Sequence, residues 1–169
     1  MTSLSELVRA RRTTKVFGEE PLDRGTIEEL LELARWAPNH HLTNPWRFRV
    51  VGPRSLERLK QADPDGARKL DRAPTLIAVS AVQTGDELAD EEDLLASAVA
   101  AYIVLLAAHA RGIASYWRTP RVLRTQEGRD ALGMPAGERV IGLLHLGYSD
   151  REWSPPPRAD AGEVVRFLE

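Results

Sequence analysis

The sequence predicts a single α+β domain in which helices and strands are combined without a regular alternation. Its 169 residues are a one-domain length. Its composition, 43% hydrophobic and 28% charged, is typical of a soluble globular protein and unlike that of a disordered chain. Four apolar runs of strand type are separated unevenly by helical patterns, and only some of the intervals suit a crossover between parallel strands.

Two helices are expected before the first strand. An S-x-x-E capping box opens the first helix, at residues 3–11, and a T-x-x-E capping box at Thr26 opens the second. The β-branched run at residues 13–16 disfavours continuation of the first helix. A loop at residues 38–45 begins and ends with proline, so the second helix is expected to stop there.

The remaining pattern predicts four strands and three further helices. The first strand alternates in hydrophobicity, whereas the second and fourth are nearly unbroken apolar runs of the kind found in buried strands. We expect strands at residues 46–51, 75–82, 113–117 and 139–146, and helices at residues 55–61, 94–110 and 121–132.

The apolar helix at residues 94–110 resembles a membrane span in composition. It is shorter than the roughly 20 residues that a span needs, and Ser97, Tyr102 and His109 interrupt it. A helix that is apolar on every side is expected to be buried, either in the protein or in an assembly. The apolar tail at residues 164–168 follows a stiff proline run and also needs a surface to cover. Together these two segments favour a dimer.

Charge and composition exclude several classes of function. Lys and Arg number 23 and Asp and Glu 25, so a net charge of −2 provides no global field for nucleic acid or an anionic membrane. Cysteine is absent, which excludes disulfides and thiol catalysis. The sequence has no Rossmann, Walker, serine-elbow or H-E-x-x-H motif, and no metal site is expected. The N-terminal stretch has no apolar signal core, which predicts a cytoplasmic protein.

The first cluster of interest is basic and lies where the first helix ends. Arginine forks and hydroxyl groups together make a good phosphate cradle, so a small phosphate-bearing ligand is one interpretation. A solvated charged face is the other. The cluster comprises Arg9, Arg11, Arg12 and Lys15, with Thr13 and Thr14 between them.

Two further clusters combine polar and aromatic side chains. The proline-bracketed loop carries His40 and Asn44, which could read the edge of a flat heteroaromatic ring. Alternatively, its Asn side chains cap their own turn. The third cluster, Trp117, Arg118 and Thr119, lies at a strand end, where site residues are commonly displayed, although Trp117 could simply fill the core edge.

The order of these clusters resembles that of the FMN-dependent nitroreductase family, in particular its shorter members, which lack a long insertion over the active site. The resembling pieces are residues 11–17 (RRTTKVF), 37–48 (APNHHLTNPWRF), 112–119 (GIASYWRT) after an Ala-rich helix, and 140–148 (VIGLLHLGY). The resemblance implies a mixed sheet flanked by helices. It also implies one FMN-binding domain over residues 1–169 that forms a homodimer, with FMN at the subunit interface and residues 155–169 extending to the partner.

The same resemblance assigns site residues by position. Arg11 and Thr13 match the residues that hold the FMN phosphate and ribityl chain, although threonine replaces the commoner serine. Asn44 stands where the longer glutamine is often found. Arg12 fills the second motif position, and Lys15 matches a residue that approaches the pyrimidine side of the ring. His40 and Asn44 match the loop that the partner presents to the flavin. A stretch that touches the flavin is matched by Trp117, Arg118 and Thr119, and Arg158 lies near the position where many members place a phosphate-binding cation.

The resemblance implies an oxidoreductase. NAD(P)H would pass a hydride to flavin N5, and a nitroaromatic, quinone or similar conjugated acceptor would then receive it in a ping-pong cycle, without a side-chain general base. The alternatives are a non-catalytic flavin-binding protein, other flavin chemistry on the same scaffold, and a cofactor-free protein that interacts through its helices.

Overall fold

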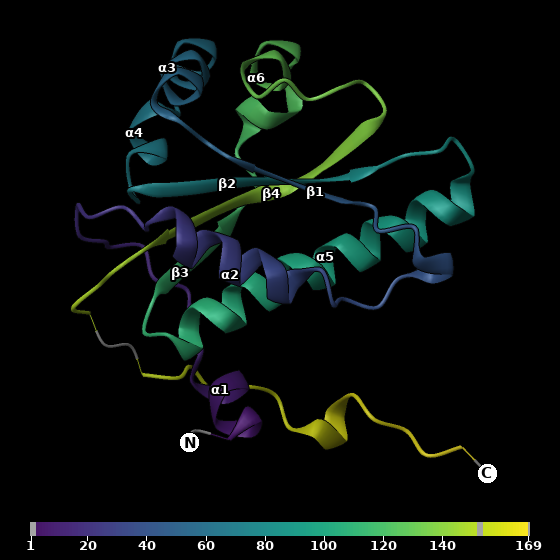
Figure 1. Cartoon of the computed structure of the whole chain (residues 1–169). Coiled ribbons are helices and arrows are strands. Elements are labelled where there is room, and N and C mark those ends of the chain that lie inside the picture. Colours follow the sequence, from purple (N-terminus) through teal and green to yellow (C-terminus); the bar gives the residue numbers. More distant parts are fainter. Residues whose placement is uncertain (1–2, 152–153, 169) are drawn as a thin grey trace.

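A four-stranded sheet lies at the centre of the computed structural model, which describes residues 3–151 and 154–168 (Figure 1). The strand order is β1-β2-β4-β3, and each neighbouring pair is antiparallel. A parallel bridge between Thr13 and Ser115 adds an N-terminal segment beside β3. The α+β class is therefore confirmed. The strands are β1 (Trp46–Val50), β2 (Thr75–Val82), β3 (Ala114–Arg118) and β4 (Glu138–Gly147).

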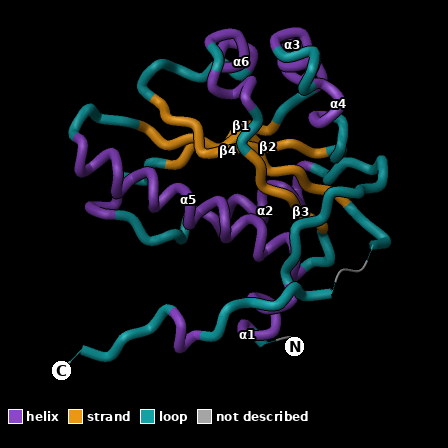
Figure 2. The backbone as a smooth tube through the Cα atoms, turned by 180° about the vertical axis from the view of Figure 1, so that it is seen from behind, coloured by secondary structure: helices purple, strands orange, loops and turns teal. Residues whose placement is uncertain are grey.

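Helices cover both faces of the sheet (Figures 1 and 2). On one face lie α2 (Arg24–Ala34) and the long α5 (Glu87–Ala110). The other face carries α3 (Pro53–Ala62), α4 (Ala67–Leu70), the 3-10 turn η2 (Arg121–Arg124) and α6 (Gln126–Ala131). The helix α1 (Leu4–Ala10) and the C-terminal tail, with its short turn η3 (Ala161–Glu163), lie apart from this body beyond α5.

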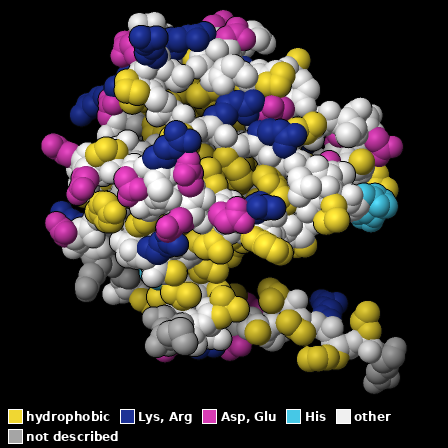
Figure 3. Space-filling model, viewed as in Figure 1, with side chains coloured by type: hydrophobic (Ala, Val, Ile, Leu, Met, Phe, Trp, Pro, Cys, Tyr) yellow, Lys and Arg dark blue, Asp and Glu magenta, His cyan; other side chains and the backbone are white. Residues whose placement is uncertain are grey.

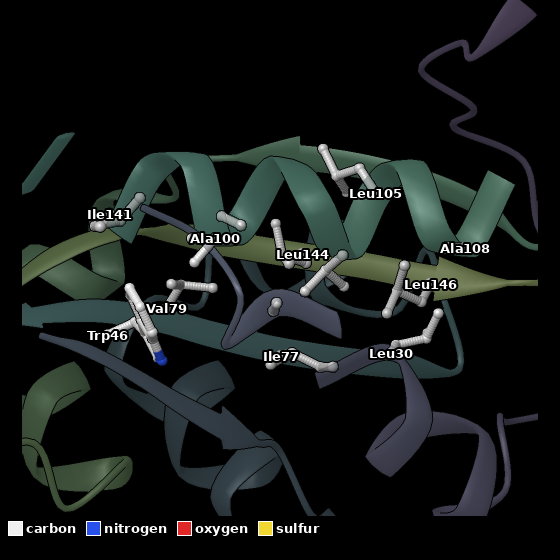
Figure 4. Close-up of a cluster of buried hydrophobic side chains, with 14 of the residues drawn as sticks. Leu30, Trp46, Ile77, Val79, Ala100, Leu105, Ala108, Ile141, Leu144 and Leu146 are labelled. Carbon is white, nitrogen blue, oxygen red and sulfur yellow. The ribbon is translucent and has the colours of Figure 1, made fainter. Parts of the chain in front are cut away.

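The core has two parts because side chains alternate across the sheet. In β4, Leu144 and Leu146 point to α5 and α2, where they meet Ile77, Leu30 and Ala100 (Figure 4). Leu143, which immediately precedes Leu144 in the strand, belongs to the opposite cluster under α3, α4 and α6. The near-continuous apolar runs of β2 and β4 thus follow from burial on both faces.

The helix α5 buries one side and exposes the other. Ala100, Val104 and Ala108 are fully buried against the sheet, whereas Leu95 and Val99 are exposed. By length and composition alone α5 could cross a membrane, but its buried side is part of the protein core. A space-filling view shows apolar side chains on both sides of the hollow that separates the body from α1 and the tail (Figure 3).

Two local expectations were wrong because of helix capping, and one short helix was not predicted. The second helix starts at Arg24, since Asp23 accepts the backbone N–H of Thr26 at 2.9 Å and is the N-cap instead of Thr26. The helix expected over 121–132 breaks into η2 and α6 at Thr125. The backbone of Thr125 is extended, and its hydroxyl accepts the backbone N–H of Gly128, so that Thr125 is the N-cap of α6. The four-residue α4 is too short for periodicity to reveal.

Gly142 in β4 is expected not to tolerate a side chain. A Cβ there would lie 2.3 Å from Nε1 of Trp117 and 2.8 Å from the carbonyl oxygen of Arg118. Gly142→Ala should therefore lower the free energy of unfolding by about 1–3 kcal/mol, because the strand or the indole must shift. Urea unfolding measures the change. Gly162→Ala is the control, since its Cβ would meet nothing within 4 Å. Equal urea midpoints for the Gly142 variant and the wild type would contradict this.

Candidate functional site

The basic N-terminal cluster lines a cavity together with the C-terminal tail. The helix α1 ends at Ala10, and Arg11 leaves it with an extended backbone. The tail returns beneath this point, so that Arg158 faces the same cavity of about 320 Å³ as Arg11, Arg12 and Thr13. The structure therefore brings together cations that lie at opposite ends of the sequence.

The segment that follows runs as an extra extended chain beside β3. The backbone N–H of Thr14 donates to the carbonyl of Ser115 at 2.9 Å. Thr14 is buried, while Thr13 and Lys15 on either side of it are exposed, as expected for alternating residues in an extended chain. Thr13 and Lys15 are therefore presented along the edge of the sheet, in line with the arginine cavity.

Arg12 is held differently from Arg11. Its Nη1 donates to the carbonyl of Arg11 at 2.5 Å, whereas its Nε is buried and has no partner among the described residues. It also lines a second cavity of about 550 Å³ with His109 and Arg151. Burial, and then the positive charges of Arg11 and Arg12, lower the pKa of His109 below its ordinary value. This corner of the protein therefore has an excess of positive charge that an anion would relieve.

The end of β3 presents side chains to two different faces. Trp117 packs at the edge of the α5-side core, and its indole N–H donates weakly to the carbonyl of Ile141 at 3.4 Å. The interpretation that Trp117 fills the edge of the core is thus supported. Arg118 donates to the carbonyl of Lys69 at 3.2 Å, and burial lowers the pKa of Arg118 below its ordinary value. Thr119 is exposed beyond the strand.

The proline-bracketed loop is capped by its own side chains. Oδ1 of Asn39 accepts the backbone N–H of Asn44 at 2.9 Å, and Nδ2 of Asn44 donates to the carbonyl of Leu42 at 2.7 Å. His41, Leu42 and Asn44 have positive φ angles of 52°, 54° and 48°, which is uncommon for residues other than glycine. The amide nitrogen of Asn44 is therefore engaged within the loop, which is held in a strained conformation typical of functional sites.

Two contacts pin this loop to the N-terminal half of α5. The hydroxyl of Thr43 donates to the buried carboxylate of Asp93 at 2.6 Å. Nδ1 of His40 lies 3.3 Å from a carboxylate oxygen of Glu92. The Arg11 guanidinium carbon lies 6.0 Å from the ring centre of Tyr102, which follows Glu92 by ten residues in α5, so the loop lies about 15 Å along the helix from Arg11. Within one chain, His40 and Asn44 therefore lie away from the arginine cavity.

Several neighbours of the site were missed in the sequence. His109 was noted only as an interruption of the apolar helix, and Arg151 was not considered, yet both share a cavity with Arg12. Tyr116 lies against Lys15, with Nζ 5.6 Å from its ring centre. In the sequence, the position of Tyr116 next to Trp117 of the third cluster was the one sign that Tyr116 belongs to the site. Among the described residues, no three His, Asp or Glu side chains are grouped as a metal site would require.

Fold and site together define an α+β protein with a cationic cavity at one edge of its sheet and a strained polar loop at the other end of its longest helix. Comparison of the sequence with known families makes the assignment specific. The Nitroreductase family matches residues 8–70 and 66–148, and the chain belongs to this family.

Individual relatives agree with this assignment. YfhC of Bacillus subtilis, provisionally named an NAD(P)H nitroreductase, is 29% identical, and the match covers 87% of this chain and 84% of YfhC. A nitroreductase-like family protein of Bacillus cereus has the same fold, with a TM-score of 0.90 at 22% identity and coverage of 100% and 97% of the two chains. A provisionally assigned nitroreductase of Desulfovibrio desulfuricans, solved in complex with FMN, has a TM-score of 0.80 at 22% identity, with coverage of 98% and 96%.

Proposed function

We propose that this protein is an FMN-dependent oxidoreductase that takes a hydride from NAD(P)H and passes it to a nitroaromatic, a quinone or a similar conjugated acceptor. One observation carries the proposal: Arg11, Arg12 and Arg158 converge on one cavity beside the exposed Thr13, in a chain of the nitroreductase family. Guanidinium groups and a hydroxyl suit a phosphate monoester, and the buried Nε of Arg12 lacks an acceptor that such a group would provide.

The chain's residues would bind and tune the cofactor rather than react themselves. FMN, when bound, would supply the redox chemistry of hydride transfer between the two substrates. The arginines anchor the phosphate, and Thr13 contributes a hydroxyl to the ribityl chain. Lys15 places a positive charge near the pyrimidine side, where it favours a reduced, negatively charged ring. No side chain needs to act as a general base in this scheme.

A homodimer with FMN at its interface is part of the proposal. The exposed Leu95 and Val99 of α5 form an apolar face that a second subunit would cover. The loop lies away from the arginine cavity within one chain, and we place the partner's His40 and Asn44 at the site, as the family resemblance implies. Residues 155–169 would reach the partner, and we place the protein in the cytoplasm.

Removing the tail is expected to weaken this dimer. In the described tail Phe167 and Leu168 are 96% and 92% exposed, so they gain burial only against another surface. A chain that ends before Glu163 should dissociate at a higher concentration than the full-length protein in sedimentation equilibrium. The matched control keeps the length and replaces Arg166 with Gln. An unchanged dissociation constant after truncation would show that the tail does not cross to a partner.

The direct test of function is spectroscopic. We expect the purified protein to be yellow, to release FMN on denaturation, and to lose its flavin absorbance in anaerobic titration with NADH or NADPH. A colourless protein that cannot take up added FMN would contradict the proposal. A yellow protein that neither nucleotide bleaches would instead favour the non-catalytic flavin-binding alternative.

A further inference from the structure

Two side chains lie against the ring of Tyr116, which is half-buried in β3. Nζ of Lys15 is 5.6 Å from the ring centre, within the range of a cation–π interaction. The imidazole centre of His145 is also 5.6 Å from the Tyr116 ring centre, with 35° between the ring planes. The parallel bridge between Thr13 and Ser115 brings Lys15 to Tyr116, because it lays the N-terminal segment along β3, and the pairing of β3 with β4 sets His145 opposite Tyr116.

The ammonium of Lys15 has no anionic partner within the described chain. No carboxylate oxygen of residues 3–151 or 154–168 lies within 4.0 Å of its nitrogen. The Lys15 side chain is exposed and would otherwise move freely. The contact described for its ammonium is the one with the electron-rich face of Tyr116.

His145, the second neighbour of the Tyr116 ring, is uncharged at neutral pH. His145 is fully buried, and neither ring nitrogen has a hydrogen-bond partner among the described residues. Burial, with smaller contributions from the charges of Arg118 and Arg72, lowers the pKa of His145 to about 4. A neutral imidazole supports the tyrosine ring without repelling Lys15, so the positive charge of Lys15 stays available to a ligand at the sheet edge.

We propose that Tyr116 is a positioning residue that holds the Lys15 ammonium at the edge of β3, and so fixes the positive charge that faces the bound flavin. This inference rests on the proposed function. It adds a residue for which the family motif gave no role. It predicts that replacement of Tyr116 affects the flavin only through Lys15.

The contact itself can be measured in the protein without FMN. The chain contains three lysines, Lys15, Lys60 and Lys69, so carbon-13 lysine labelling gives three side-chain ε signals. We expect the Lys15 signal to be displaced upfield by the ring current of Tyr116. The displacement should persist in Tyr116→Phe and vanish in Tyr116→Leu. Tyr148→Leu, at another partly exposed tyrosine, is the matched control and should leave it unchanged. A Lys15 signal without displacement in the wild type overturns the proposal, whether or not any variant folds.

The consequence for the flavin is measured in the FMN-loaded protein. Tyr116→Leu should raise the FMN dissociation constant by roughly two- to fivefold, as expected for loss of one exposed cation–π contact. It should also shift the reduction potential to more negative values, in the direction expected for Lys15→Met, which removes the positive charge that favours the reduced ring. Tyr116→Phe should retain the wild-type potential, and Tyr116→Leu should add nothing in the Lys15→Met background.

Failure of this inference differs from failure of the proposed function. If the wild type binds FMN and Tyr116→Leu keeps the wild-type potential, the positioning role is wrong while the oxidoreductase proposal stands. If Tyr116→Leu still lowers the potential in the Lys15→Met background, Tyr116 acts independently of Lys15 and the positioning role is again wrong. If the wild type binds no FMN, both proposals fail.

Discussion

Replacing His145 with leucine is expected to abolish a pH dependence of stability. Between pH 6.5 and pH 4 the free energy of unfolding of the wild type should fall by about 3 kcal/mol because of His145, and the variant should not show this fall. The pKa of His145 falls from its ordinary 6.5 to about 4 in the folded protein, chiefly through burial. Over this interval the unfolded chain therefore binds a proton that the folded chain does not, and the free energy of unfolding decreases as the pH falls. Below pH 4 both states are protonated at this residue and its contribution stops changing.

The measurement is urea unfolding of the wild type and the variant at several pH values across this range. His145→Phe serves as the matched control, because it also removes the titration but packs differently. The two variants are expected to differ from each other in absolute stability while sharing the same flatter pH profile. Parallel profiles for wild type and variants would show that the pKa of His145 is the same in the folded and unfolded states.

Element positions followed from hydrophobic patterns, whereas helix ends depended on competing caps. The apolar runs of β2 and β4 were predicted because burial on both faces imposes its pattern on every residue, whereas α5 was expected from residue 94 and begins at Glu87, after the N-cap Asp86. At the start of α2, the sequence offers both Asp23 and Thr26 as caps, and Asp23 prevails because its carboxylate bonds both the backbone and the hydroxyl of Thr26. Thr125 has the same role within a segment that periodicity alone treats as one helix.

The candidate site was predicted where its residues are consecutive and missed where they meet through the fold. The basic motif at residues 11–15 is visible in the sequence. Arg158 was named only through the family resemblance, and Arg151 was missed, because both arrive through the path of the chain after β4, which no local pattern specifies. The pairing of Lys15 with Tyr116 likewise depends on a long-range bridge.

The proline-bracketed loop shows a different limit. The sequence left open whether its polar side chains serve a ligand or their own turn. The structure shows that Asn39 and Asn44 cap the turn, while Thr43 and His40 fasten it to α5. Such self-capping is compatible with a role toward a partner's ligand, because a loop must be rigid to present a side chain.

Arg11→Gln and Arg158→Gln are each expected to weaken FMN binding by roughly 10- to 100-fold, a loss of about 1.5–3 kcal/mol. Both guanidinium groups line the cavity proposed for the phosphate, and each would lose a charge-assisted hydrogen bond. Equilibrium titration by flavin fluorescence measures the effect. Arg54→Gln is the matched control, because Arg54 is exposed on α3, away from this cavity. Its FMN affinity should equal that of the wild type.

Riboflavin separates contact with the phosphate from contact with the ring, because it lacks the phosphate and keeps the isoalloxazine. The wild type should bind FMN more tightly than riboflavin, and Arg11→Gln and Arg158→Gln should lose most of that preference while keeping the riboflavin affinity. An equal loss of affinity for both ligands would mean that the substitution disturbs the ring site or the fold. An Arg158→Gln variant with wild-type FMN affinity would show that the tail arginine, although it faces the cavity, does not hold the phosphate.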